Sequence, residues 1–428
     1  MIKGLLIIIF LFLPILCFGA TTQVLISGSA NDLDAAATEY IAFYGTGGNH
    51  TNSLWNATEA NRRGVIPAAG VIDDLHVELQ NAPDNGAGVQ SFTFSLMVAG
   101  AGTTLGCAVS EAATTCTDSD GVSVTAGQLI SLEVVPANTP TVGDAFWSAT
   151  WTPTTADKTI FMGGMGSTAL ATSGTEYLAI TGVKNASATS FDNELVVPTG
   201  GVLKDLYIEL GTDPGDGTTR IFTVTGDGGS FACTVTGSAG GTNKTCNNTS
   251  GTITIAAGET YVITSTVTGT PAASTVSYGM VFDPTTEGEW IFGHCSENDM
   301  NATTTEYRDI AGAGGAWIST ETDRRQLAGT AFTIKNFYVE ASGLAGSGKS
   351  YVFTPRKEVA DMSATFTCTT DNTNVQCNDT ENITITADDL LSFEVEPVST
   401  PTVRDSTYSF TGFITPTDGA ERRIMVVN

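Results

Sequence analysis

Apolar and polar residues alternate with a period of two along much of this chain. Residues 92–98 read Phe-Thr-Phe-Ser-Leu-Met-Val, and residues 75–79 read Leu-His-Val-Glu-Leu. This period is typical of half-buried strands. Clusters of glycine, proline, asparagine and aspartate at 81–86, 118–121 and 212–217 indicate turns between strands. No amphipathic helix is evident after residue 20. With 47 glycines, the chain is predicted to be all-β and built from antiparallel β-sandwiches of the jelly-roll kind.

The strand pattern repeats three times. The phrase Thr-Glu-Tyr begins at Thr38, Thr175 and Thr305, and a strand resembling Leu203-Lys-Asp-Leu-Tyr-Ile-Glu-Leu follows each copy. Residues 107–142 align with 368–403 without a gap. Each repeat is about 130 residues long, which is too long for a solenoid repeat and long enough to form its own hydrophobic core. We therefore expect three tandem jelly-roll domains, at 21–158, 159–289 and 290–428.

Residues 1–20 have the features of a secretory signal peptide. Lys3 supplies one early positive charge, an apolar run follows from Gly4, and small residues stand at Gly19 and Ala20. An uncleaved N-terminal anchor is the alternative, and a lipid attached at Cys17 is less favoured. The sequence therefore predicts a protein that is secreted or displayed on an extracellular surface.

Cysteine spacing agrees with export to an oxidising compartment. Six cysteines form three close pairs, which we expect to be disulfides within each domain: Cys107 with Cys116, Cys233 with Cys246, and Cys368 with Cys377. Cys295 is left over. It is either buried as a free thiol or bonded to another molecule.

Asn-x-Ser/Thr acceptors are frequent and would carry glycans if the host performs N-glycosylation. They are Asn49, Asn56, Asn185, Asn243, Asn247, Asn248, Asn301, Asn378 and Asn382.

The formal charge of −27 excludes a protein that binds a nucleic-acid backbone, because such a protein needs a basic surface. An acidic surface could hold divalent cations. Asp118-Ser-Asp120 is a solvated turn or an incidental calcium site, because no glutamate follows at the offset that a calcium loop requires. No cofactor is expected.

Motifs that suggest catalysis are weak. Gly343-Leu-Ala-Gly-Ser-Gly-Lys-Ser matches a nucleotide-binding P-loop, yet a strand-like segment follows it where a helix would be needed. His50, His76 and His294 have neither triad nor zinc spacing. His76 is expected to face solvent between two core residues, and His294 beside Cys295 is a weak candidate for a nucleophilic pair. We therefore expect no enzyme.

Arginine pairs recur at equivalent places, 62–63 and 324–325, and a third pair stands at 422–423. They form salt bridges with nearby acids, or they dock the acidic surface of a neighbouring subunit or a glycan.

Residues 126–134, Ala-Gly-Gln-Leu-Ile-Ser-Leu-Glu-Val, precede an aromatic strand, and the third copy ends with Tyr408-Ser-Phe-Thr-Gly-Phe-Ile. These segments resemble jelly rolls of the tumour-necrosis-factor and complement-head type, a fold shared with exosporium and phage-fibre surface proteins. The resemblance implies a non-enzymatic module for assembly, adhesion or recognition. Members of that family are usually single trimeric heads on a stalk, whereas three copies stand in tandem here.

A similar strand stands at every domain boundary. It begins at Gln23–Ile26 and returns near 159–162, 290–293 and 424–427, so three domains have four such strands. An open sheet edge at either end of the chain would pair with another copy and build a head-to-tail filament. The alternative is that 424–427 completes the third domain. The candidate assembly residues are Gln23, Ile26, Ile424, Val427 and Cys295.

The leading interpretation is thus a rod of three domains that serves as a secreted structural protein and binds further copies of itself. The alternative is an adhesin whose loops bind a surface glycan or receptor. Trp55 and Trp317 would be its exposed aromatic residues.

Overall fold

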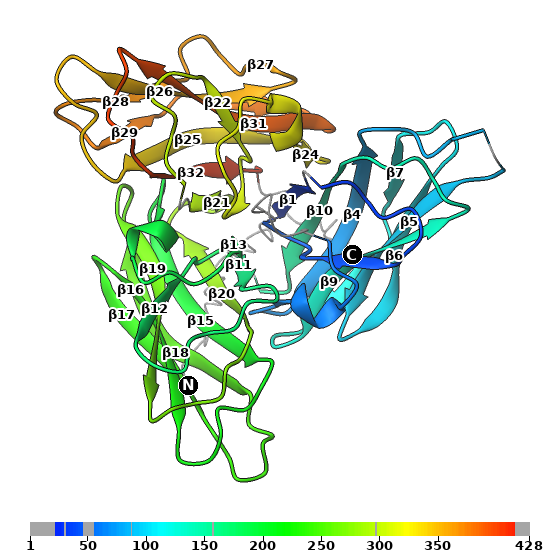
Figure 1. Ribbon diagram of the computed structural model, residues 1–428, viewed down its shortest axis with the longest axis vertical. Helices are drawn as coiled ribbons and strands as arrows, with labels where there is room; N and C mark the ends of the chain where they lie inside the picture. The colour runs from blue at the N-terminus through cyan, green and yellow to red at the C-terminus, as the bar shows by residue number, and fades with distance from the viewer. Residues whose placement is uncertain are drawn as a thin grey trace, which may run out of the picture.

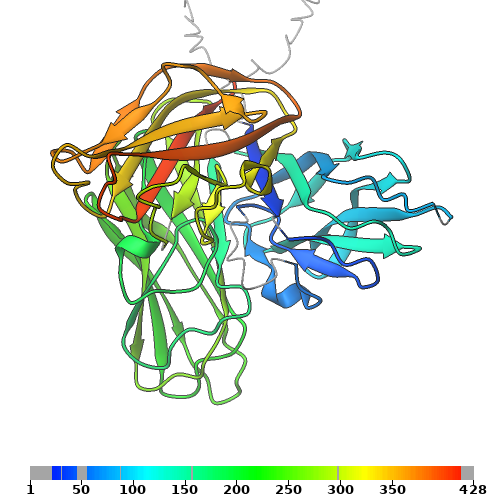
Figure 2. The same cartoon turned by 45° about the horizontal axis from the view of Figure 1, so that its top comes forward.

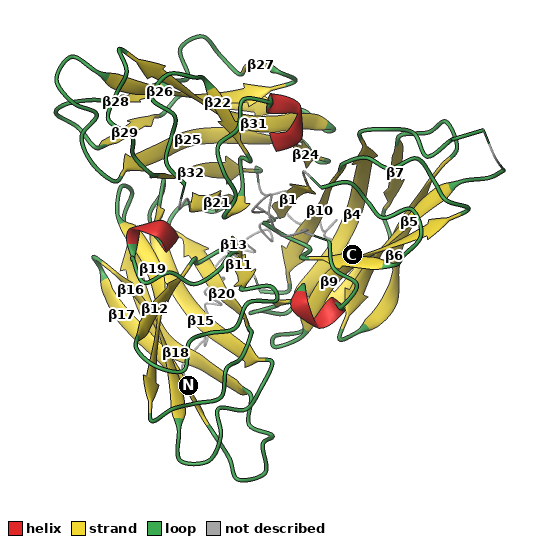
Figure 3. Ribbon diagram, in the orientation of Figure 1, coloured by secondary structure: helices red, strands yellow, loops and turns green. Residues whose placement is uncertain are grey.

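A computed structural model describes residues 22–29, 31–45, 55–86, 88–155, 158–295 and 298–415. Within these ranges the protein is all-β, as the alternating pattern predicts, and its sheets are mainly antiparallel. The helices that the structure describes are three single 3-10 turns, η1 (Glu59–Asn61), η2 (Phe191–Asn193) and η3 (Glu321–Arg324) (Figure 3). Among these residues no helix has the length and apolar character needed to cross a membrane. The expected signal peptide lies outside them.

The first repeat folds as two facing sheets. One contains β1, β10, β4, β7 and β8, and the other contains β2, β9, β5, β6 and β3. The strands are β1 (Gln23–Ser29), β2 (Glu39–Ile41), β3 (Gly64–Val65), β4 (Gly70–Leu79), β5 (Ser91–Val98), β6 (Ala101–Ser110), β7 (Thr115–Asp118), β8 (Val122–Val124), β9 (Leu129–Ala137) and β10 (Ala145–Pro153).

The second repeat has the same plan. Its sheets are β13-β11-β20-β15-β18 and β12-β19-β16-β17 with β14 beside β19. The strands are β11 (Thr159–Gly164), β12 (Thr175–Leu178), β13 (Gly182–Val183), β14 (Leu195–Val196), β15 (Gly201–Leu210), β16 (Thr219–Gly226), β17 (Gly229–Thr236), β18 (Thr245–Ile255), β19 (Thr260–Thr268) and β20 (Val276–Pro284).

The third repeat again has two sheets, one of which contains β23, β21, β32, β25, β29 and β30, and the other β22, β24, β31, β26, β27 and β28. The strands are β21 (Glu289–Cys295), β22 (Glu306–Arg308), β23 (Gly312–Ala313), β24 (Gln326–Ala328), β25 (Phe332–Ala341), β26 (Ser350–Lys357), β27 (Ala360–Asp361), β28 (Cys368–Thr370), β29 (Gln376–Asp379), β30 (Ile383–Ile385), β31 (Asp389–Val398) and β32 (Ser406–Phe413).

Each repeat buries its own apolar face between its two sheets. In β4 the residues that point inward, Ile72, Leu75, Val77 and Leu79, are at most 3% exposed. Equivalent residues of β15 and β25 are also buried. Each of the three main hydrophobic clusters is drawn mostly from one repeat. The domain boundaries themselves stay a prediction.

The three predicted disulfides are present. They join β6 to β7, β17 to β18, and β28 to β29, with Cα atoms 5.8, 5.9 and 5.6 Å apart. Each disulfide lies within one repeat, as the cysteine spacing indicates, and links two consecutive strands that belong to its two facing sheets.

The expected rod is wrong. The three repeats form three lobes arranged around a common centre (Figures 1 and 2). One sheet continues from the third repeat into the first, because β24 pairs with β1 at Ser27 and Leu327. The first and last lobes are thus in direct contact, and the arrangement closes on itself.

Candidate functional site

The first functional feature is the set of contacts between repeats. For clarity, β1, β11 and β21 are called the first strands, β10, β20 and β32 the last strands, and β3, β14 and β24 the docking strands. In each repeat the first strand pairs antiparallel with the last strand. The docking strand of one repeat lies on the first and last strands of the next: β3 on β11 and β20, β14 on β21 and β32, and β24 on β1 and β10. These contacts define seams 1–2, 2–3 and 3–1.

Each seam has a hydrogen bond to a serine of the last strand, although the donors and acceptors differ. At seam 1–2 the Ser277 hydroxyl donates to the carbonyl of Arg63 over 2.8 Å. At seam 2–3 the Ser409 hydroxyl donates to the carbonyl of Val196. At seam 3–1 the backbone N–H of Gly329 donates to the Ser148 hydroxyl over 2.6 Å. Each repeat therefore has a donating surface, which is its docking strand, and a receiving surface, which is formed by its first and last strands. The contact is head to tail and is repeated until the ring closes.

Three equivalent glycines meet at the centre. Gly45, Gly182 and Gly312 each stand seven positions after the threonine of their Thr-Glu-Tyr phrase. A Cβ added at Gly182 would lie 2.6 Å from the nitrogen of Ala313 and 2.7 Å from the carbonyl oxygen of Gly45. All three glycines have positive φ. Only glycine allows both this backbone and this close approach.

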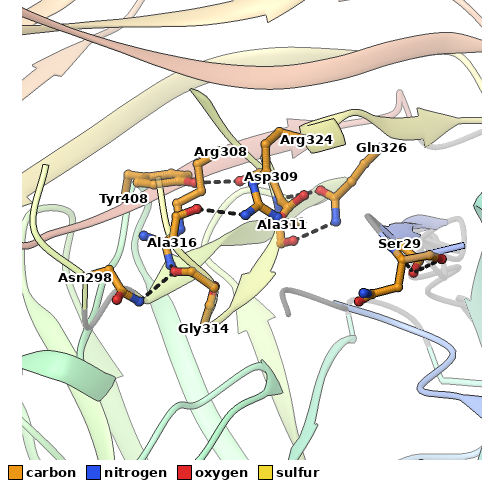
Figure 4. A network of polar contacts seen from close by, with 12 residues as sticks. Ser29, Asn298, Arg308, Asp309, Ala311, Gly314, Ala316, Arg324, Gln326 and Tyr408 are labelled. Carbon is orange, nitrogen blue, oxygen red and sulfur yellow. Dashed lines mark hydrogen bonds and ion pairs between the residues drawn. The ribbon is translucent and has the colours of Figure 1, made fainter. Parts of the chain in front are cut away.

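Beside this centre, the third repeat contains a buried polar network (Figure 4). Arg308 donates to the carbonyl of Gly314 over 2.7 Å and lies 5.5 Å from the ring centre of Trp317. The Tyr408 hydroxyl donates to the carbonyl of Asp309 over 2.5 Å. Burial raises the pKa of Asp309 to about 6, and nearby Arg324, 3.7 Å away, opposes that shift.

Gln326 connects the network to the docking strand. Its side chain donates to the carbonyl of Ala311 and accepts from the N–H of Ala311, both over 2.8 Å. Gln23 makes the same pair of bonds with Ile160, over 3.0 and 2.8 Å. These fully buried amides satisfy backbone groups at the centre that no neighbouring strand pairs.

The adjacent residues His294 and Cys295 do not form a nucleophilic site. Both are fully buried, and His294 stacks on Tyr408 with ring centres 5.7 Å apart. Burial lowers the pKa of His294 well below its usual range and raises that of Cys295 to about 12. The thiol is free, protonated and enclosed, which removes the nucleophile that the pairing would require.

Both expected adhesin aromatics are in the core, so the prediction that they are exposed is wrong. Trp55 is 1% exposed and packs against Trp147, with ring centres 5.6 Å apart. Trp317 is 4% exposed.

The other motifs occupy plain turns. The segment 343–350 joins β25 to β26, and a strand follows it. Asp118 accepts backbone N–H groups from Gly106 and Asp120. Within the described ranges no group of three or more metal-binding side chains occurs.

His76 points away from its own core, as expected, and is partly exposed: its side chain keeps 22% of its surface open and lies 3.0 Å from Asp388 of the third repeat, which is 64% exposed. The arginine pairs also lie at the seams: Arg63 binds Glu59 at 2.7 Å, and Arg325 stacks on Phe146 of the first repeat at 5.5 Å. His50 and the pair 422–423 lie outside the described residues.

The predicted open edge at β1 is absent. Gln23 and Ile26 are fully buried, and β1 is paired with β10 along its length. Ile424 and Val427 lie outside the described residues.

The predicted glycan acceptors differ in exposure. Asn243, Asn247, Asn301, Asn378 and Asn382 are exposed, whereas Asn56, Asn185 and Asn248 are half-buried. Asn49 lies outside the described residues.

No known protein family matches the chain, and no curated protein is similar to it. Among solved structures, it shows a low similarity to the VP2 subviral particle of infectious bursal disease virus. The identity is 10% over 96% of this chain and 85% of that one, with a TM-score of 0.19.

Proposed function

We propose that this protein is an extracellular structural protein whose copies assemble head to tail. The observation that carries the proposal is the directional contact between repeats, because every repeat has one donating and one receiving surface. Within one chain these surfaces satisfy one another, so assembly requires seam 3–1 to open and to exchange its donating and receiving surfaces with neighbouring copies. Three disulfides fit an oxidising location, and the tumour-necrosis-factor-type jelly roll is the fold that we propose for each repeat.

The segment 424–427 is the part of the chain that we assign to assembly. It resembles the first strands, each of which lies against a last strand of its own repeat. In another copy the corresponding position is held by β1, so strand exchange at that position would link two molecules. The adhesin alternative is not favoured, because both tryptophans on which it rested are buried.

Deleting residues 422–428 tests the assignment. We expect the truncated protein to remain folded and disulfide-bonded but to lose any filaments seen by electron microscopy. A synthetic peptide of residues 421–428 should also inhibit assembly of the full chain, and a peptide with Ile424 and Val426 changed to aspartate should not. Filaments that persist after the deletion, or a full chain that is monomeric at every concentration, would overturn the proposal.

A further inference from the structure

The three seams are built alike, but seam 3–1 carries different chemistry at one contact. At seam 1–2 the turn residue Gly127 faces the ring of Tyr207, which a Cβ on the glycine would meet at 3.9 Å. At seam 2–3 Gly258 faces Tyr338 in the same way, at 3.4 Å. At seam 3–1 these positions are held by Asp388 and His76, whose Oδ1 and Nδ1 atoms are 3.0 Å apart.

The backbone shows that Asp388 occupies a glycine position. Its φ is +68°, and those of Gly127 and Gly258 are +86° and +87°. A side chain is disfavoured in this left-handed region. Unlike a glycine, Asp388 can contact His76 through its side chain. This contact is an ion pair only when the imidazole is protonated.

A second titratable group lies at the same seam. Asp144, just before β10, is 5% exposed and faces Asp323 of the third repeat as well as Asp32. Burial, and after it the carboxylates of Asp323 and Asp32, raise the pKa of Asp144 to about 7 against the opposing charges of Arg324 and Arg325.

Glu78 adds a third group. Burial raises its pKa, Arg325 lowers it, and Glu358 and Asp388 of the third repeat raise it. The pKa of Glu78 is therefore raised mainly by burial, and ionised Glu78 faces both Arg325 and two like charges across the seam.

The other seams differ in charge and in connection. The residue equivalent to Asp144 at seam 1–2 is neutral Thr275. At seam 2–3 it is Asp405, near Asp192, Asp299, Lys184 and Arg308. Seams 1–2 and 2–3 join consecutive repeats through the short segments 154–158 and 285–288, whereas no direct linker joins the first and third repeats.

We propose that seam 3–1 is a proton-controlled joint, closed at acid pH and loosened as the pH rises, while seam 1–2 stays closed. Opening separates β24 from β1 and β10 and exposes the apolar contact among Phe146, Leu327 and Leu390.

Protonation neutralises Asp144 and Glu78, whose pKa values are both raised in the closed seam, so both carboxyl groups favour closure at acid pH. Because the pKa of Asp144 lies at about 7 in the folded protein against 3.8 ordinarily, its contribution is complete below pH 3.8 and is lost as the pH rises to about 7.

Hydrogen exchange of the full-length, disulfide-bonded protein at pH 5 and pH 8, corrected for intrinsic exchange rates, measures each seam separately. We expect the protection of β1 and β24 to fall by on the order of tenfold or more between the two pH values. Protection of β3 and β11 at seam 1–2 should stay unchanged. Equal protection of β24 at both pH values, or an equal fall at seam 1–2, would overturn the proposal.

Two variants separate the joint from a general effect of pH. H76Y/D388G gives seam 3–1 the tyrosine and glycine of the other seams, and Asp144→Thr gives it the residue of seam 1–2. Each should reduce the pH dependence of β24, and their combination should abolish most of it. Asp120→Thr, an exposed carboxylate away from the seams, is the control and should behave as the unmodified chain. A combined variant that is folded by circular dichroism but keeps the full pH dependence would contradict the assignment. If the variant does not fold, the comparison of seams in the unmodified chain still decides.

Discussion

The glycines at the centre show that the absence of one atom, the Cβ, allows three repeats to pack closely together. Gly182 contacts backbone of both neighbouring repeats, so a side chain there would separate them. Its φ of +81° adds a conformational cost for any other residue. The close approach of the three repeats at this point therefore requires glycine at residue 182.

Gly182→Ala should lower the free energy of unfolding by about 2–5 kcal/mol, from backbone strain together with overpacking. Gly217→Ala is the matched control, because its φ is +74° and a Cβ there meets nothing within 4 Å. That control should cost only about 1 kcal/mol. Chemical denaturation measures both, and equal costs would show that the central contact adds nothing.

The side of a strand that a residue faces could be predicted from the sequence more often than the atoms that lie against that side. The alternation around Leu75 and Val77 correctly places His76 on the side away from its own core, yet Asp388 of another repeat lies against it there. Trp55 looked like a loop residue, but it packs on Trp147. The spacing of nearby residues contains no information about contacts with distant parts of the chain. Neither the contact of His76 with Asp388 nor that of Trp55 with Trp147 could therefore be predicted.

At the scale of elements, sequence predicted most of the structure. Period two identified β4, β5, β15 and β25, and paired cysteines identified strands that lie side by side. The docking strands were missed because each has only two or three residues, too few for a period to appear. Their nearest signal is the arginine pair that precedes β3 and β24.

Removal of one disulfide tests the contribution of a strand pair. Replacing Cys233 and Cys246 with serine opens a loop with a sequence separation of 13 residues between β17 and β18. The loop-entropy model gives a loss of about 2–3 kcal/mol. Because the bond lies within the second repeat, hydrogen exchange should increase there first. A loss of protection spread evenly over all three repeats would instead mean that the chain unfolds as one unit.

The whole-molecule arrangement could not be deduced from the repeats alone. A tandem array is compatible with a rod or a closed ring, and the difference lies in β24 reaching β1 across the full length of the chain. Nothing in the sequence of either strand predicts that the two strands pair.

Small-angle X-ray scattering distinguishes these shapes in solution. A compact molecule of this size should have a radius of gyration of about 22 Å, whereas three such lobes in a line would exceed roughly 30 Å. We expect the smaller value at pH 5. A value near that of the line at this pH would contradict the closed arrangement.

The seams also have a consequence for how such a molecule can change by mutation. In a homotrimer encoded by a single-copy gene, each substitution appears at all three interfaces at once. Here the three interfaces are encoded separately, so Tyr207 and Tyr338 are retained at two of them while His76 stands at the third. A chain that encodes its three interfaces separately can therefore change one of them without changing the other two, which an assembly of three identical subunits cannot do.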